Sequence, residues 1–186
     1  MMHRDSTGVV QRIEPGALNW MTAGRGIVHS ERTPDDLRQV VRRNHGLQLW
    51  VAVPAEAEEA EPAFSHTAAA DIPEVDTHGA RVRVLVGSAF GLTSPVPAVS
   101  PTAYLDISLR AGARLPLPPV AVERALYGVD GGFEVDGVLV EPFTLAVLPQ
   151  GATVTITSAT GARLAMVGGA PLGHRASRHR SLSDGP

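Results

Sequence analysis

Short apolar segments separated by turn residues constrain this sequence more than any other feature. The 186 residues include 19 Gly and 15 Pro, and the apolar runs between them are short and rich in β-branched side chains. In the segment 81–86 the valines share one face of a strand and the arginines the other. Asp136-Gly137 is typical of a tight hairpin turn, in which Gly supplies a positive φ. The pattern predicts an all-β sandwich or barrel.

Nine segments fit this strand pattern. They are Val9–Ile13, Gly46–Val53, Arg81–Val86, Ala103–Leu109, Val122–Gly128, Gly132–Val135, Leu145–Leu148, Ala152–Thr157 and Arg163–Val167. A helical turn is predicted over Pro34–Arg43, with Thr33 as its N-cap. The acidic stretch 55–61 is predicted to be a solvated connector. Residues 173–186 fit neither pattern, so we expect a disordered tail there, with a basic anion-binding arm as the alternative.

Composition excludes several classes of function. The net charge is −3 and the sequence pI is about 6.1, so no basic field is present to attract nucleic acid or an anionic membrane. The chain has no Cys, which excludes disulfides, thiolate nucleophiles and Cys-ligated zinc. Its start is polar, and no apolar run approaches the ~20 residues of a membrane helix. We therefore expect a cytoplasmic protein without membrane or direct nucleic-acid partners.

A weak internal repeat indicates two related β units in tandem. Glu14-Pro15 matches Glu141-Pro142, and Gly24 matches Gly151, at a common offset of 127 residues. At this offset His29 corresponds to Ile156 and Glu31 to Ser158. The first unit therefore carries metal-binding side chains where the second has none.

His29 and Glu31 form the sharpest candidate site. In a strand, side chains two residues apart point to the same face, which places an imidazole beside a carboxylate. Such nitrogen and oxygen donors suit a divalent first-row metal. Gly24 and Gly26 relieve crowding just before this segment. The alternative is a partly buried His29 that is hydrogen-bonded to Glu31 and has only a structural role.

Several segments resemble the pirin family. They are Glu14-Pro15-Gly16, Trp20-Met21-Thr22-Ala23-Gly24-Arg25-Gly26-Ile27-Val28-His29-Ser30-Glu31, His3-Arg4-Asp5-Ser6, His45-Gly46-Leu47-Gln48-Leu49-Trp50-Val51 and Gly168-Gly169-Ala170-Pro171-Leu172-Gly173. The resemblance spans roughly residues 3 to 173. It implies two tandem cupin-type β-sandwich barrels, the first incomplete. The expected parts are the rest of the metal-type cupin at 1–54, a linker at 55–74, a cupin without metal ligands at 75–172, and the tail at 173–186.

The resemblance also implies a metal and an activity. Pirins hold one mononuclear metal, usually iron, through three histidines and one glutamate, and His29 and Glu31 match the third histidine and the glutamate. Nickel, manganese and zinc are the alternatives. Some members are quercetin 2,3-dioxygenases, so the implied substrate is a flavonol, and Glu31 is the implied catalytic residue that takes its hydroxyl proton. Trp20 and Met21 either line the substrate pocket or fill the barrel core.

The sequence departs from the family pattern at both ends. The resemblance implies a His-x-His pair on a strand upstream of His3, and we expect the chain to begin too late to include it. His3 itself matches a position that is not a ligand in the family. We therefore expect weak or no metal binding, impaired dioxygenase activity, and self-association through exposed strand edges. The alternative function is a non-catalytic module for protein contact or regulation.

Overall fold

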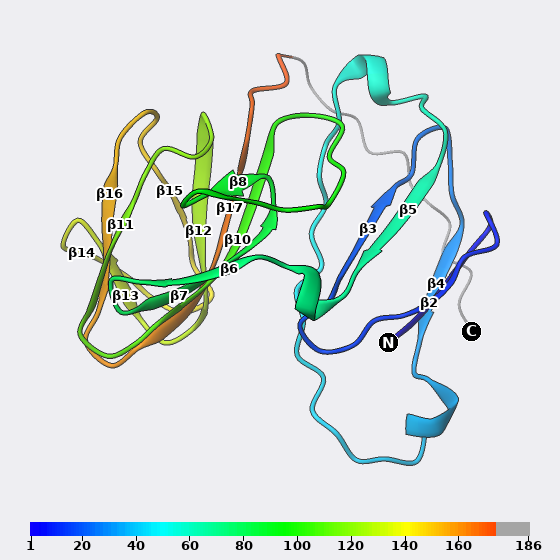
Figure 1. The fold of residues 1–186 in the computed structure, drawn as a ribbon, viewed down its shortest axis with the longest axis horizontal. Helices are drawn as coiled ribbons and strands as arrows, with labels where there is room; N and C mark the ends of the chain where they lie inside the picture. Colours follow the sequence, from blue (N-terminus) through cyan, green and yellow to red (C-terminus); the bar gives the residue numbers. More distant parts are fainter. Residues whose placement is uncertain (174–186) are drawn as a thin grey trace. The chain divides into compact units, whose positions relative to one another are not determined.

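A computed structural model describes residues 1–173 of the chain, which group into two compact units (Figure 1). Unit 1 comprises residues 1–69 and 172–173 of the described chain, and unit 2 comprises residues 70–171. Apart from three single-turn 3₁₀ helices, all regular elements of the described residues are β-strands, which confirms the all-β class. None of the described helices has the length and apolar character that a membrane crossing requires.

Unit 2 contains a six-stranded antiparallel sheet and a four-stranded antiparallel sheet. The first has the order β15 (Leu145–Val147), β12 (Glu123–Asp130), β17 (Ala162–Gly169), β10 (Thr102–Leu109), β7 (Ala80–Val86) and β6 (Glu74–Thr77). The second has the order β11 (Ala113–Leu117), β16 (Val154–Ser158), β13 (Phe133–Val135) and β14 (Val138–Val140). A short hairpin, β8 (Ser88–Ala89) with β9 (Leu92–Thr93), follows β7.

The alternating strands of unit 2 enclose one apolar core. On β10, Leu105 and Ile107 are fully buried, while Asp106 between them points outward. They share the core cluster with Leu115 on β11, Ile156 on β16 and Met166 on β17. Burying one such side chain stabilises the fold by about 1.5–3 kcal/mol. The period-2 pattern of the sequence therefore determines which face of each sheet packs inward.

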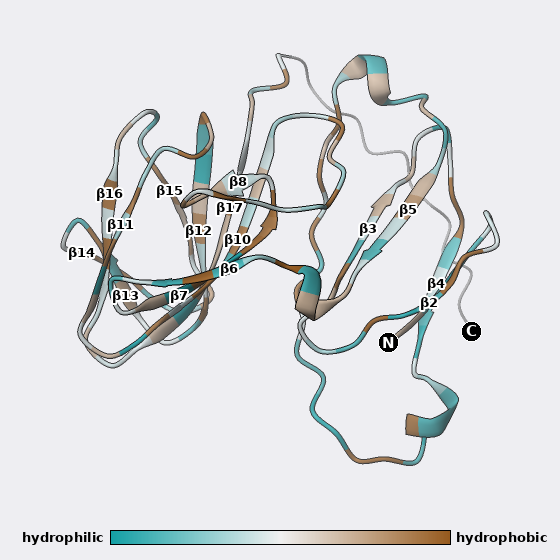
Figure 2. Ribbon diagram, viewed as in Figure 1, coloured by the Kyte–Doolittle hydropathy of each residue, from teal (hydrophilic) through white to brown (hydrophobic). Residues whose placement is uncertain are grey.

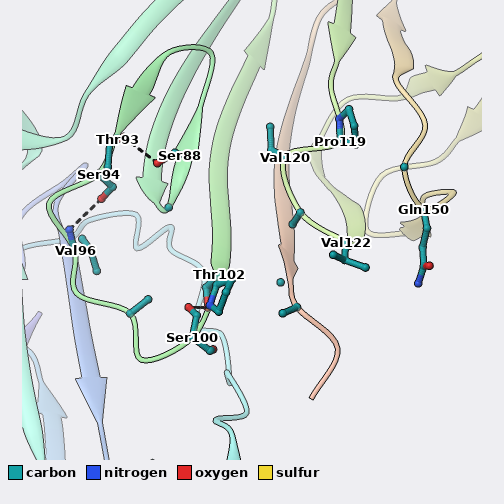
Figure 3. Close-up of a pocket in the computed structure, with 17 residues that line it drawn as sticks. Ser88, Thr93, Ser94, Val96, Ser100, Thr102, Pro119, Val120, Val122 and Gln150 are labelled. Carbon is teal, nitrogen blue, oxygen red and sulfur yellow. Dashed lines mark hydrogen bonds between the residues drawn. The ribbon is translucent and has the colours of Figure 1, made fainter. Parts of the chain in front are cut away.

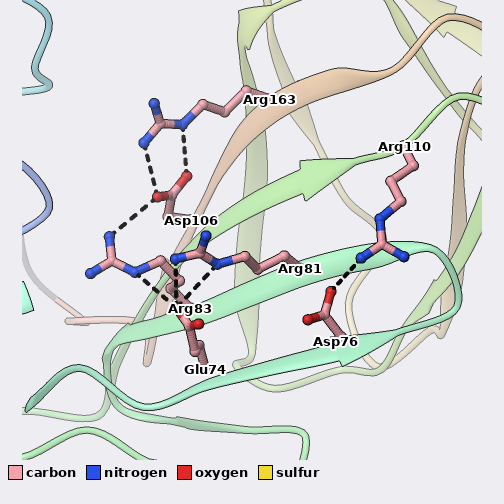
Figure 4. Close-up of polar contacts among 7 residues, drawn as sticks. All are labelled: Glu74, Asp76, Arg81, Arg83, Asp106, Arg110 and Arg163. Carbon is pink, nitrogen blue, oxygen red and sulfur yellow. Dashed lines mark hydrogen bonds and ion pairs between the residues drawn. The ribbon is translucent and has the colours of Figure 1, made fainter. Parts of the chain in front are cut away.

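Charged side chains cover the opposite face of β6, β7 and β10 (Figure 4). Asp106 accepts two hydrogen bonds of 3.0 Å from Arg163 on β17 and lies 3.6 Å from the Arg83 guanidinium. Glu74 on β6 pairs with Arg81 on β7 at 2.7 Å. These pairs leave the outer face polar. The half-exposed pair of Glu74 with Arg81 adds little to stability, whereas Asp106 and Arg83 are largely buried.

Unit 1 has two smaller antiparallel sheets. One has the order β2 (Val10–Arg12), β1 (Met2–Asp5) and β4 (His29–Arg32), and the other pairs β3 (Leu18–Thr22) with β5 (Ala63–Thr67). β4 is hydrophilic along its length (Figure 2), whereas β7 and β10 of unit 2 each bury apolar side chains. The remaining elements are the 3₁₀ turns η1 (Asp35–Leu37) and η2 (Ala55–Ala57), with η3 (Ala69–Asp71) at the boundary of the two units.

The strand order of the two units repeats. β1 pairs with β2 on one side and β4 on the other, just as β13 pairs with β14 and β16. Gly16 and Phe143 lie 127 positions apart, and both have positive φ, +82° and +63°. Gly24 and Gly151 do the same, at +51° and +67°. The offset found in the sequence therefore corresponds to a repeated backbone path.

Two expectations for residues 34–53 are wrong. Gly46–Val53 is not a strand, because no described strand offers it a pairing partner, and Leu47, Leu49 and Trp50 are exposed there. The helical turn expected at Pro34–Arg43 shortens to η1, and Pro34, not Thr33, is its N-cap residue.

The structure also bears on two other segments. The expected linker at 55–74 contains strand β5, which pairs with β3 of unit 1. Of the expected tail at 173–186, residues 174–186 lie outside the described part of the chain.

Candidate metal site

The pairing of β1 with β4 places four titratable side chains on one face of the sheet. Asp5 is the cross-strand partner of His29, and His3 is the partner of Glu31. Cross-strand partners in an antiparallel ladder share a face, and so do residues two apart on one strand. We call these residues, His3 and Asp5 on β1 with His29 and Glu31 on β4, the donor face. The structure therefore brings the two sequence-predicted donors to the same side of their strand.

His3 is buried within the donor face. Its residue exposure is only 2%, and its ring stacks against Phe64 of β5 with centroids 4.4 Å apart and against His29 with centroids 5.6 Å apart. Its Nε2 lies 2.9 Å from Oδ2 of Asp5. This contact occupies one ring nitrogen of His3, while the stacking fixes the plane of the ring beside His29.

Asp5 is buried and holds His3 through a hydrogen bond. Its side chain has no exposed surface, and its Oδ1 accepts hydrogen bonds from both the backbone N–H and the hydroxyl of Thr7, at 2.9 and 2.6 Å, and from the Val9 N–H at 3.2 Å. Burial alone would raise the pKa of Asp5, but the hydrogen bonds from Thr7, His3 and Val9 lower it to about 2. The carboxylate is therefore charged at neutral pH and can hold a proton on Nε2 of His3.

Two glycines shape the backbone that leads into β4. At Gly24, with φ +51°, an added Cβ would come within 1.9 Å of the carbonyl oxygen of Ala60. That oxygen accepts a hydrogen bond from the N–H of Arg25 at 3.0 Å, so the segment before β4 is held against residue 60. Gly26 has φ +136°, a conformation that other residues rarely adopt. Glycine is therefore needed for two different reasons. At Gly24 the backbone of residue 60 leaves no room for a Cβ, and at Gly26 the backbone conformation is one that other residues rarely adopt.

Trp20 and Met21 point to opposite faces of β3. Met21 pairs with Phe64, and Trp20 pairs with Ser65. Because Phe64 stacks on His3, Met21 lies on the side of β3–β5 that contacts the donor face, and Trp20 lies on the other side. Both side chains are half-buried. Of the two residues predicted for a substrate pocket, only Met21 shares a face with Phe64.

Sequence reasoning missed the supporting residues of this site. His3 and Asp5 are two residues apart, the same spacing that singled out His29 and Glu31, so this signal was present in the sequence. His66 lies on β5, and its Nδ1 is 2.7 Å from Oδ1 of Asn19. Its role depends on the pairing of β3 with β5, which no local pattern showed.

In the second unit, apolar side chains stand at the positions that match Asp5 and His29. Val135 and Ile156 are cross-strand partners on β13 and β16, as Asp5 and His29 are on β1 and β4. Ile156 is fully buried and pairs on its other side with Leu115 of β11, which is fully buried as well. Unit 2 therefore has hydrocarbon at the positions of Asp5 and His29, and a serine, Ser158, at the position of Glu31.

The donor face supplies only part of a metal coordination sphere. Among residues 1–173, no group of three or more His, Asp and Glu side chains is placed to hold a metal ion. His29 and Glu31 can provide one nitrogen and one oxygen donor, whereas His3 is engaged by Asp5. A divalent ion on this pair would take its remaining ligands from water or from other groups.

Comparisons with known proteins agree with this architecture. The "Pirin" family profile matches residues 1–51, and the "Pirin C-terminal cupin domain" profile matches residues 104–179. A pirin-like protein of Caulobacter vibrioides is 41% identical over 174 residues, covering 93% of this chain and 60% of its own length. The chain thus spans about 60% of the length of this relative.

Solved structures show the same fold. A crystal structure titled quercetin 2,3-dioxygenase from Acinetobacter baumannii is 31% identical, with a TM-score of 0.77, and the match covers 92% of this chain and 56% of that one. A bacterial pirin from Escherichia coli in complex with nickel(II) has a TM-score of 0.64 at 17% identity, covering 89% and 66% of the two chains. From its sequence, its two tandem cupin-type units and these relatives, the chain belongs to the pirin family.

Proposed function

We propose that unit 1 contributes His29 and Glu31 to a divalent-metal site of a pirin-type oxidoreductase related to quercetin 2,3-dioxygenases. The observation that carries the proposal is the register of β1 and β4, which aligns the two donors on one face beside a buried, hydrogen-bonded imidazole. The nickel(II) complex of the Escherichia coli pirin supports a divalent metal in this fold. Iron is the first candidate here, with nickel, manganese and zinc as alternatives for the same donor types.

The incomplete donor set determines the expected affinity. Two protein ligands leave most of the coordination sphere to water, and each missing ligand weakens binding. We therefore propose that the 186-residue chain binds metal weakly and turns over a flavonol slowly or not at all.

The chain's own residues define what the site would do with a substrate. A bound metal would act as a Lewis acid toward an oxygen-bearing ligand. Glu31 is exposed on β4 and can accept a proton from a flavonol hydroxyl. Met21 and Phe64 offer an apolar wall on the same side as His3. A small aromatic substrate is thus the proposed ligand class.

Metal titration of the intact chain tests this proposal. Calorimetry with Ni²⁺ or Mn²⁺ should give weak binding at one site per chain, and both His29→Ala and Glu31→Gln should abolish it. His45→Ala is the matched control, because His45 is an exposed histidine of the same unit away from any strand, and it should leave the titration unchanged. Binding that survives His29→Ala, or that His45→Ala removes, would contradict the assignment.

A non-catalytic contact module is the second candidate. Its supporting observation is the exposed apolar stretch of unit 1, in which Leu47, Leu49 and Val51 are 43–44% exposed and Trp50 is 76% exposed. A wild-type chain that binds no metal yet associates through this stretch would favour the module over the oxidoreductase.

A further inference from the structure

Unit 2 contains a cavity of about 990 Å³ that is separate from the donor face (Figure 3). One wall consists of residues between Gly87 and Thr102, and the other consists of residues 119–122 with Gln150 and Gly151. This volume lies in the range of small-molecule sites. No lining residue carries a charge, and most of the exposed lining is apolar, with Val96, Val120 and Val122 among its members.

Several hydrogen-bond donors in the cavity remain available to a ligand. Within residues 1–173, neither the Ser100 hydroxyl nor the Gln150 side-chain amide has a hydrogen-bond partner. The Ser88 and Thr93 hydroxyls lie 2.9 Å apart, so one proton is used between them and the other is free. Thr102 is already engaged through its bond to the Ser100 carbonyl. The free donors lie on both walls.

A buried arginine ties the second wall together. Arg124 on β12 is only 2% exposed, and its guanidinium donates to the carbonyl oxygens of Pro118 and Pro149 at 2.9 Å and of Ala152 at 2.6 Å. Pro118 immediately precedes the lining segment 119–122, and Pro149 and Ala152 flank the lining pair 150–151. The side chain thus fixes both parts of this wall.

The charge of Arg124 has no counter-ion among the described residues. Its three hydrogen-bond acceptors are neutral carbonyls, and its buried Nε has no partner. Burial lowers the pKa of Arg124, with no carboxylate opposing that effect. Because a trans peptide points its C=O and N–H in opposite directions, the peptide between Pro149 and Gln150 aims its N–H away from the guanidinium. Positive potential therefore reaches the wall at Gln150.

We propose that this cavity is a second ligand site, which binds a small monocarboxylate with an apolar body. One uncompensated guanidinium balances a single negative charge, and the free donors suit carboxylate oxygens. The neutral lining offers no partner to a multiply charged phosphate. The apolar walls take the rest of the ligand. The site does not depend on metal binding at His29 and Glu31.

An NMR titration of the intact chain with benzoate, and with benzamide as its neutral counterpart, tests the proposal. Benzoate should shift the backbone amide signals of Ser100, Gln150 and Gly151 saturably, with those of β1 and β4 unchanged. Benzamide should bind about tenfold more weakly, because it lacks the charge. Equal affinity for the two probes, or no saturable shift, would overturn the proposal.

Substitutions locate the binding within the cavity. Gln150→Leu and Ser100→Ala should each weaken benzoate binding by about tenfold. Ser108→Ala, at an exposed serine of β10 outside the cavity, should have no effect. Gln150 and Ser100 lie at the surface of the cavity, so these variants test the site without removing the buried Arg124. Unchanged benzoate affinity in both would contradict the site.

Discussion

At the scale of single residues, the donor face differs from an ordinary strand face by its buried polar groups. His3 and Asp5 are both buried, a placement that costs free energy unless their polar atoms are paired. Here Asp5 accepts from three residues, and His3 is held between two rings. At the matching place in unit 2, Val135 packs in hydrocarbon. Burying His3 and Asp5 in spite of this free-energy cost is consistent with a role for the two residues in positioning His29.

Replacing His3 separates its stacking from its hydrogen bond. His3→Ala removes both and should lower the free energy of unfolding of unit 1 by about 2–4 kcal/mol, measured by urea unfolding followed through Trp fluorescence. His3→Phe keeps a ring between Phe64 and His29 and should recover part of that loss. Metal affinity should fall about 10–100-fold in His3→Ala, which removes the ring that stacks on His29, and should fall less in His3→Phe, which keeps a ring there. Full metal affinity in His3→Ala would show that His3 does not position His29.

Tyr104 on the outer face of unit 2 gives a pH-dependent signal. Burial, and secondarily the nearby Asp106 carboxylate, raise the pKa of its hydroxyl from 10.0 to about 12. A raised pKa stabilises the fold fully below pH 10, and this contribution is lost as pH rises toward 12. An ultraviolet absorbance titration should show a late tyrosine step near pH 12 that Tyr104→Phe removes. The same late step in the variant would contradict this assignment.

At the scale of elements, the sequence predicts the strands that bury their own apolar face. Arg81–Val86 and Ala103–Leu109 coincide closely with β7 and β10, because alternation alone determines their inward side. Gly46–Val53 has a similar alternation but forms no strand, since a strand also needs a neighbour to pair with and no described strand pairs with this segment. β5 was not predicted, because its segment AFSHT lacks a clear strand pattern. It is a strand because it pairs with β3. The shared face of His29 and Glu31 was predictable from spacing, whereas the stack of His3 on Phe64 required the tertiary pairing.

The glycine before β4 should be sensitive to a single methyl group. Gly24→Ala places a Cβ against the Ala60 carbonyl and should cost about 2–4 kcal/mol of unfolding free energy. Gly8→Ala is the matched control: its φ is also positive, at +92°, but no atom lies within 4 Å of the added Cβ, so only the backbone cost of about 1 kcal/mol remains. Both Trp residues, Trp20 and Trp50, lie in unit 1, so urea unfolding followed by Trp fluorescence measures the difference. Equal losses would mean that the contact with residue 60 is not tight.

At the scale of the whole molecule, apolar burial is distributed unequally. Apart from Pro34, Ile27 is the one buried hydrophobic side chain among the described residues of unit 1, whereas the core cluster lies wholly in unit 2. Burial of apolar surface is the main source of folding stability. We therefore expect unit 1, which contains the donor face, to rely more on hydrogen bonds and half-buried rings than unit 2 does.

Hydrogen exchange should reveal this inequality directly. Amides of β10 and β17 should exchange only on global opening of unit 2, while those of β1 and β4 should exchange through a lower-energy opening of unit 1. Leu105→Ala creates a cavity in the core and should lower the free energy of opening of unit 2 by about 2–5 kcal/mol, which speeds amide exchange there. Exchange in β1 and β4 should stay unchanged. Added Ni²⁺ should slow exchange in β1 and β4 and leave β10 and β17 unchanged, because ligand binding stabilises only the unit that holds it. One common rate for both units would show that they unfold together and that unit 1 draws its stability from contacts beyond its own core.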